Sequence, residues 1–188
     1  MSSILLTGPA VEPLSLADAK AYLRVAHDDD DDVIGVLIAS ARGHIEARTR
    51  RALITQTWRI VRDAWPADGR IAVTPAPLQE IAQARVFDID GAAQVLDLQA
   101  FVLDTAAAPA IVSFAPWAMP APGRAVAGIE IDVVVGYGDA AADVPEPLIL
   151  AIRMLLAHWY EHRGVIGANA ALPAGVPELI APYRALAL

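Results

Sequence analysis

The stretch DDDDDVIGVLIASARGHIEARTRRAL, residues 28–53, is the part of the sequence that does most to decide the fold. Apolar residues recur in it at the spacing of one helix face; they are Val33, Ile34, Leu37, Ile38, Ala41, Ile45 and, less regularly, Ala52. Acidic residues precede this face and arginines follow it, an order that complements the helix dipole. The stretch predicts an amphipathic helix from Val33 to about Leu53 with one buried face.

Two further helices are predicted on either side of this one. Ser15 followed by Asp18 is typical of a capping-box start, and a short helix is expected from there to about Val25. Near the other end, Val144-Pro145-Glu146-Pro147 marks the start of a helix, since proline is tolerated in the first turn. That helix is expected to run from Leu148 to His162, with one apolar face made of Leu148, Ile152, Leu155, Leu156 and Trp159.

The region between these helices has the frequent turn-forming residues that are typical of a β structure. Proline recurs too often for long helices; it stands at positions 66, 75, 77, 109, 116, 120 and 122. The clearest strand is GIEIDVVVGY, residues 128–137, and Asp90-Gly91 is a hairpin-turn signal. We therefore expect antiparallel strands here.

Together these patterns predict an α+β fold, in which two N-terminal helices and a C-terminal helix form a small bundle with an inserted antiparallel β region. The expected division is a helical core from residues 1–53 and 143–188 and a β region from residues 54–142. Residues 176–188 are predicted to be a docking tail, because they are apolar but follow a loop rich in Ala, Gly and Pro.

Composition excludes several classes of protein. The 188 residues include no cysteine, so disulfides and thiol chemistry are excluded. The net charge of −8 makes the chain a poor candidate for gripping nucleic acid, whose phosphates supply most of the binding affinity. The start, residues 1–12, has no basic segment and only the short apolar run Ile4-Leu5-Leu6. We expect neither a signal peptide nor a membrane helix.

One pattern resembles a catalytic metal site. His158-Trp159-Tyr160-Glu161-His162 matches the inverted zincin motif H-x-x-E-H, in which two histidines on one helix face bind zinc. Beyond the predicted helix end, only Glu178 could serve as a further acidic ligand. The alternative is that Trp159 packs inward and the histidines decorate the helix end, and we expect no metal here.

Other chemistry has less support. Asp28–Asp32 could attract calcium but lacks the alternating ligands and glycine of an EF-hand loop, so a solvated acidic helix start is the preferred interpretation. No G-x-S-x-G nucleophile motif and no phosphate-binding glycine loop is present. We therefore expect a protein that is not an enzyme and needs no cofactor.

The order of these segments resembles the head–tail connector proteins, or head-completion adaptors, of tailed bacteriophages and gene transfer agents. The matching segments are LSLADAKAYLRV (residues 14–25), the Asp run with VIGVLIASAR (33–42), Ile45-Glu46 with the arginines after it, TQTW (55–58), Tyr137-Gly138, VPEPL (144–148), Ala151-Ile152 and HWYEHR (158–163). The resemblance covers most of the chain and is weakest in the β region.

The resemblance implies a structural role in a particle. Such proteins form a ring, usually of twelve copies, between the portal protein and the next neck, stopper or tail protein, and DNA passes through the channel without specific binding. Assembly in the bacterial cytoplasm followed by residence at the head–tail junction of the particle is then expected. The rival interpretations are a zinc-dependent hydrolase using His158 and His162 and a monomeric protein-binding domain.

Two sets of interaction residues follow from these expectations. Arg48, Arg50 and Arg51 are predicted to lie at the subunit interface, because they put positive charge at one end of a helix that begins with acids. The docking tail is predicted to contact the portal through apolar and interface-type side chains; they are Leu179, Ile180, Tyr183, Arg184 and Leu186.

Overall fold

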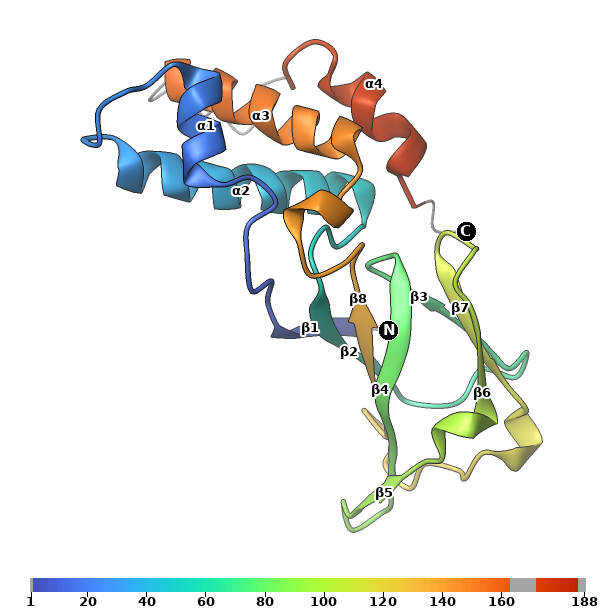
Figure 1. The fold of residues 1–188 in the computed structure, drawn as a ribbon. Helices are drawn as coiled ribbons and strands as arrows, with labels where there is room; N and C mark the ends of the chain where they lie inside the picture. Colours follow the sequence, from blue (N-terminus) through green and yellow to red (C-terminus); the bar gives the residue numbers. More distant parts are fainter. Residues whose placement is uncertain (1, 163–171, 186–188) are drawn as a thin grey trace. The chain divides into compact units, whose positions relative to one another are not determined.

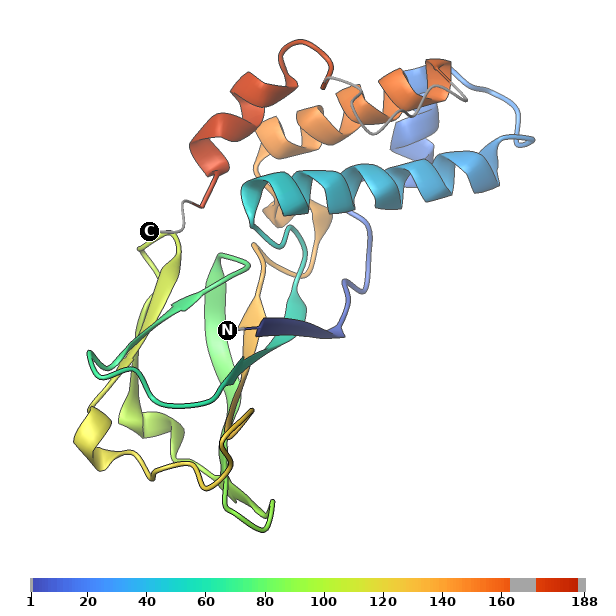
Figure 2. The same cartoon turned by 180° about the vertical axis from the view of Figure 1, so that it is seen from behind.

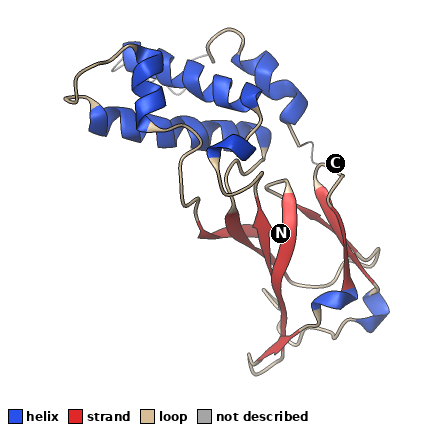
Figure 3. Cartoon of the chain, in the orientation of Figure 1, coloured by secondary structure: helices blue, strands red, loops and turns tan. Residues whose placement is uncertain are grey.

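The computed structural model describes residues 2–162 and 172–185, and the chain divides into two compact units. The helical unit is made of Ala10–Ile54 and Tyr137–Arg184, and the β unit contains Met1–Pro9 and Thr55–Gly136. Each unit therefore combines segments that are far apart in the sequence. Figure 3 shows that helices and strands are segregated between them, apart from short helical turns. The predicted α+β class is confirmed.

The described part of the helical unit contains four α-helices: α1 (Leu16–Leu23), α2 (Asp31–Thr49), α3 (Glu146–Glu161) and α4 (Val176–Ile180). In Figures 1 and 2, α2 and α3 lie side by side, with α1 crossing near one end and α4 near the other. Their common core is apolar and closed to solvent; it includes Ile34, Ile38, Ala41, Ile45, Leu148, Ile152, Leu155 and Leu156. The helical spacing of these residues is the pattern that predicted the two long helices.

The helix starts are held by the polar residues around them. The Asp18 amide donates to Ser15 Oγ at 3.1 Å, so the predicted cap of α1 is confirmed. Lys20 Nζ lies 2.6 Å from a carboxylate oxygen of both Asp28 and Asp31. The acidic run before α2 is thus partly neutralised by a lysine of the preceding helix.

Among the described residues of the β unit, eight antiparallel strands form two sheets. The five-stranded sheet has the order β1 (Ser2–Thr7), β2 (Gln56–Arg62), β8 (Ile129–Val135), β4 (Leu78–Phe87), β5 (Ala93–Val95). The three-stranded sheet has the order β3 (Arg70–Val73), β7 (Ala110–Phe114), β6 (Phe101–Asp104). Two short turns, η1 (Leu98–Ala100) and η2 (Pro116–Ala118), lie in the connections.

Alternation of side chains gives each sheet an apolar inner face. Ile60 of β2 pairs with Ile131 of β8, and both are fully buried. Trp65 packs edge-on against Phe114 of β7, with ring centroids 4.8 Å apart, and Trp65 Nε1 donates to the Pro120 carbonyl at 2.9 Å. Trp65 is half-buried, and with its N–H bonded in this way it contributes to packing of the β unit rather than offering a free ring for stacking.

The structure corrects two expectations about the ends of the chain. Residues 1–53 were expected to belong to the helical core, but Ser2–Thr7 is strand β1, pairs with β2 and belongs to the β unit. The segment from Val176 was expected to become ordered only on binding a partner. Instead, α4 and η4 (Ala181–Tyr183) pack onto the helical unit, with Val176 and Ile180 inside its core. Both features depend on contacts with residues distant in the sequence, which local patterns do not reveal.

No helix within residues 2–162 and 172–185 is long and apolar enough to cross a membrane.

Burial of Ile180 makes a direct prediction about stability. Its side chain is only 3% exposed, so Ile180→Ala should lower the free energy of unfolding by about 2–4 kcal/mol, through lost burial and a cavity. The matched control is Leu150→Ala on α3, where the side chain is 40% exposed and the expected loss is less than about 1 kcal/mol. Denaturant unfolding of both variants measures the difference. Equal, small losses would show that α4 is not part of the core.

Candidate interaction surfaces

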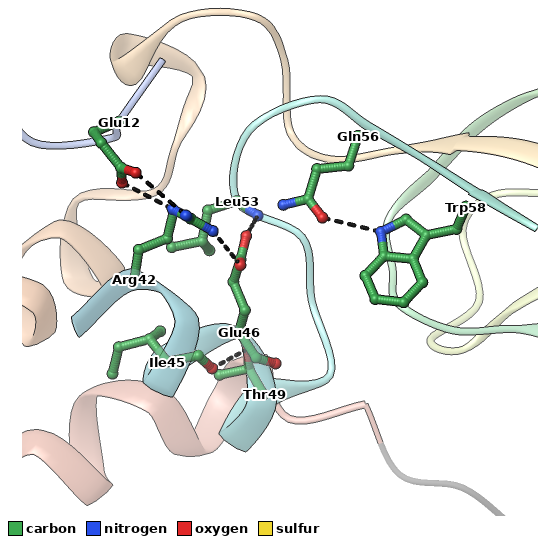
Figure 4. Close-up of polar contacts among 8 residues, drawn as sticks. All are labelled: Glu12, Arg42, Ile45, Glu46, Thr49, Leu53, Gln56 and Trp58. Atoms are coloured by element: carbon green, nitrogen blue, oxygen red, sulfur yellow. Dashed lines mark hydrogen bonds and ion pairs between the residues drawn. The ribbon is translucent and has the colours of Figure 1, made fainter. Parts of the chain in front are cut away.

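Arg42 of α2 organises the polar side of the helical unit. Figure 4 shows its guanidinium between two glutamates: Nε lies 2.8 Å from Glu12 Oε2 and Nη1 lies 2.8 Å from Glu46 Oε2. Burial disfavours the charged guanidinium, but the hydrogen bonds and negative charges of Glu12 and Glu46 outweigh it, so the pKa of Arg42 is raised. Glu46 Oε1 also accepts the Leu53 amide at 2.9 Å. The network ties the segment before α1 and the segment after α2 to the middle of α2.

The three arginines predicted for the subunit interface differ in position. Arg48, in the last turn of α2, and Arg50, its left-handed C-cap residue, are exposed. Arg51 is half-buried, its Nε donates to the Tyr183 carbonyl at 2.5 Å, and its guanidinium lies 5.8 Å from the centroid of the Tyr137 ring. Arg48 and Arg50 are therefore accessible for a subunit contact, while Arg51 holds η4 against the end of α2.

The residues predicted to dock a partner are also spread over different environments. Ile180 is buried, Leu179 and Tyr183 are half-buried against the helical core, and Arg184 is exposed. Leu186 lies outside the described residues. Ile180 cannot contact a partner unless α4 detaches, so docking through this segment, which stays a prediction, falls to Leu179, Tyr183 and Arg184.

The two histidines of the zincin-like pattern stack on each other at the end of α3. Their ring centroids are 4.5 Å apart, and His162 Nδ1 lies 2.8 Å from the His158 carbonyl oxygen. Within residues 2–162 and 172–185, no group of three or more His, Cys, Asp or Glu side chains could hold a metal ion. Neither the zinc nor the calcium interpretation gains support from the described residues.

The outer face of the five-stranded sheet carries a neutral ion network. Arg59 on β2 makes two hydrogen bonds to Asp132 on β8, at 2.7 and 2.9 Å. Arg85 on β4 lies 2.9 Å from Glu130 and 3.1 Å from Asp132. The hydrogen bonds to Asp132 raise the pKa of Arg59. Two arginines and two acids thus satisfy one another across three strands, so this face offers no net positive charge to a phosphate.

Exposed apolar side chains form the surfaces that the sequence analysis missed. On β1, Ile4, Leu5 and Leu6 are all exposed. At connections of the β unit, Ile89, Trp117 and Val126 are more exposed still, and Trp117 of η2 is 89% exposed. Such side chains are typical anchors of protein–protein contacts rather than of catalytic sites. The Ile4-Leu5-Leu6 run was visible in the sequence, but only its strand geometry shows that it is exposed.

Comparisons with known proteins match this picture. Residues 13–83 match the family model described as phage gp6-like head-tail connector protein. The predicted resemblance to head–tail connector proteins is confirmed. No curated protein sequence matches the chain.

Three similar solved structures come from gene transfer agent (GTA) particles. A chain in the neck of an empty GTA particle, computed with C6 symmetry, has a TM-score of 0.86 and 25% identity, and the match covers 100% of this chain and 97% of that one. A chain in the virion of a native GTA particle has a TM-score of 0.85 and 25% identity, with the same coverage. A chain in the neck of a native GTA particle, computed with C12 symmetry, has a TM-score of 0.81 and 26% identity, again with 100% and 97% coverage.

His44 on α2 makes the stability of the helical unit sensitive to pH. Its ring meets Trp159 of α3 edge-on, with centroids 5.8 Å apart, and its Nε2 is buried without a hydrogen-bond partner among the described residues. Burial, and then the charge of Arg48, lower the pKa of His44 from its ordinary value of about 6.5. Below that value the unfolded chain therefore binds more protons than the folded chain, and stability falls as pH falls.

The prediction is that His44→Gln reduces the loss of thermal midpoint between pH 7.5 and pH 5.5. His27→Gln is the matched control, because the His27 side chain is 55% exposed, and it should follow the wild-type profile. Thermal unfolding across this range measures both. A His44→Gln profile parallel to the wild type would remove His44 from the pH response.

Proposed function

We propose that the chain is a structural adaptor in the head–tail junction of a phage-like particle. The main support is structural: a neck chain of a GTA particle matches 100% of this chain with a TM-score of 0.86. A shared small domain would not give this result, because the match includes both the helical and the β unit. The family match at residues 13–83 supports the same role independently.

The adaptor is proposed to act as a ring of copies of this chain, twelve in number, under the portal protein and above the next neck, stopper or tail protein. The C6 and C12 symmetries of the similar necks support a ring. DNA would pass through its channel without specific binding. The net charge of −8 supports this, since an acidic wall does not hold phosphate. Assembly is proposed to take place in the bacterial cytoplasm.

Two exposed arginines are proposed to contribute to contacts between neighbouring copies. Arg48 and Arg50 lie at the end of α2, and the exposed Asp29 lies in the acidic run before its start. A ring contact joins one patch to a different patch of the next copy, so opposite charges on separate parts of the unit suit it. The portal contact is proposed to involve Leu179, Tyr183 and Arg184.

The rival functions have less support. A zinc hydrolase would need a third ligand beside His158 and His162, and the described residues offer no such group. A monomeric binding domain would leave the match to neck chains of symmetric particles without a reason.

The test is removal of the gene from cells that produce the particles. The adaptor role predicts heads and tails that accumulate separately, seen by electron microscopy, because the junction cannot form. Wild-type protein supplied in trans should restore tailed particles, and the double variant Arg48→Glu, Arg50→Glu should restore few of them while remaining folded. Tailed particles in normal number without the chain would contradict the proposed function; full rescue by the double variant would contradict only the role of the arginines.

A further inference from the structure

Strand β1 has a partner on one side only. It stands at the end of the five-stranded sheet and pairs with β2 in the register Ser2↔Val61 to Leu5↔Trp58. No other strand of the described chain pairs with its second edge. Figure 1 shows β1 beside β2. A free edge presents a row of backbone N–H and C=O groups that can pair with another strand.

The sequence of β1 lacks the features that usually protect such an edge. Folded proteins guard exposed edges with charges, proline, short length or a bulge. The strand SSILLT has no charge and no proline, and six residues make it the longest edge strand; β5 has three residues and β3 and β6 have four. One irregularity occurs in its pairing, between Leu5 and Thr7, and it leaves Ser2–Leu5 regular.

Both faces of β1 are apolar and half exposed. Ile4 and Leu5 point to opposite faces, because side chains alternate along the regular part of the strand. Ile4 is 50% exposed and Leu5 is 46% exposed, and Leu6, at the irregularity in the pairing, is 42% exposed. Ser3 differs, since its hydroxyl donates to the Thr74 carbonyl at 3.4 Å inside the β unit. A strand added to this edge would bring cover to apolar residues on both faces of the sheet.

We propose that β1 is the edge at which a second copy of this chain adds a strand. This inference rests on the proposed function, in which identical copies stand side by side in a ring. An uncharged apolar edge suits an uncharged strand and not DNA, whose contacts are made by basic side chains. The chain itself carries such strands: β5, with the sequence AQV, is exposed at all three residues. If β1 of one copy pairs with a different strand of the next copy, the contact joins two different surfaces. Such a heterologous contact is what a closed ring requires.

The experiment compares self-association of the full chain by sedimentation velocity over a range of concentrations. Ile4→Lys and Leu6→Lys place on the edge the residue that most often blocks strand addition. Each should weaken self-association by at least about tenfold without lowering the thermal midpoint. Val126→Lys is the matched control, since it makes the same kind of change at a 73% exposed site before β8. Each variant moves the net charge from −8 to −7, so general charge repulsion falls and cannot cause a loss.

Hydrogen exchange of the wild-type protein provides a second test that needs no variant. Backbone amides of residues 2–7 should become more protected in assembled than in dilute protein, because the free edge gains hydrogen bonds. This measurement decides the question even if a lysine variant fails to fold.

The outcomes separate the inference from the function on which it rests. If the wild type assembles and both lysine variants assemble as well, or if residues 2–7 gain no protection, the role of β1 is wrong and the adaptor function stands. If Val126→Lys weakens assembly equally, the effect is not specific to the edge and the role of β1 is again wrong. A wild-type chain that remains monomeric at every concentration overturns self-pairing through β1 and the ring together.

Discussion

The hydrogen bond from the Tyr137 amide to the Leu53 carbonyl, 3.3 Å long, closes the point at which the chain leaves the helical unit and returns to it. The β region between these residues can be inserted only if its two ends meet. Packing of α2 on α3 brings them together on the helical side. Within the β unit, the two ends of the inserted region pair with each other as strands β2 and β8. The pair nearest the helical unit in sequence is Gln56↔Val135. Gln79 reinforces it by donating to Thr55 Oγ1 and to the Gly136 carbonyl. Both units therefore depend on contacts between segments that the whole β region separates.

Several basic side chains inside each unit are paired with acidic ones. Lys20, Arg42, Arg59 and Arg85 all bind carboxylates within their own unit. These four cations are engaged with carboxylates and are not available to bind phosphate. The neutral network on the sheet also keeps charge off a face that a neighbouring copy could cover.

Helix positions could be predicted from the sequence because their signals are local. The apolar spacing of Ile34, Ile38 and Ile45 and the Ser15 cap act within a few residues, and both appear in the structure. The position of β1 could not be predicted, because Ser2–Thr7 becomes a strand only by pairing with β2, whose residues are fifty or more positions away. The burial of Val176 and Ile180 was missed for the same reason. An apolar segment after a loop suits either a core or a partner, and only the packing of α4 on α3 distinguishes the two.

The candidate site shows the same limit at the level of single residues. Arg48 and Arg50 are exposed as an interface requires, but Arg51 is half-buried and bonded to the Tyr183 carbonyl. All three have the same sequence signal, a positive charge at the end of a helix, so no local pattern separates them. Exposed Trp117 gave no usable signal, because a tryptophan in a proline-rich loop reads equally well as core.

The central claim, that this chain is a component of the neck, is tested most directly by a cryo-EM reconstruction of the particle produced by its source. The account predicts density that fits both the helical unit and the β unit, repeated around the axis at the head–tail junction. A complete neck, built at a resolution that identifies every chain and containing no copy of this one, would contradict it.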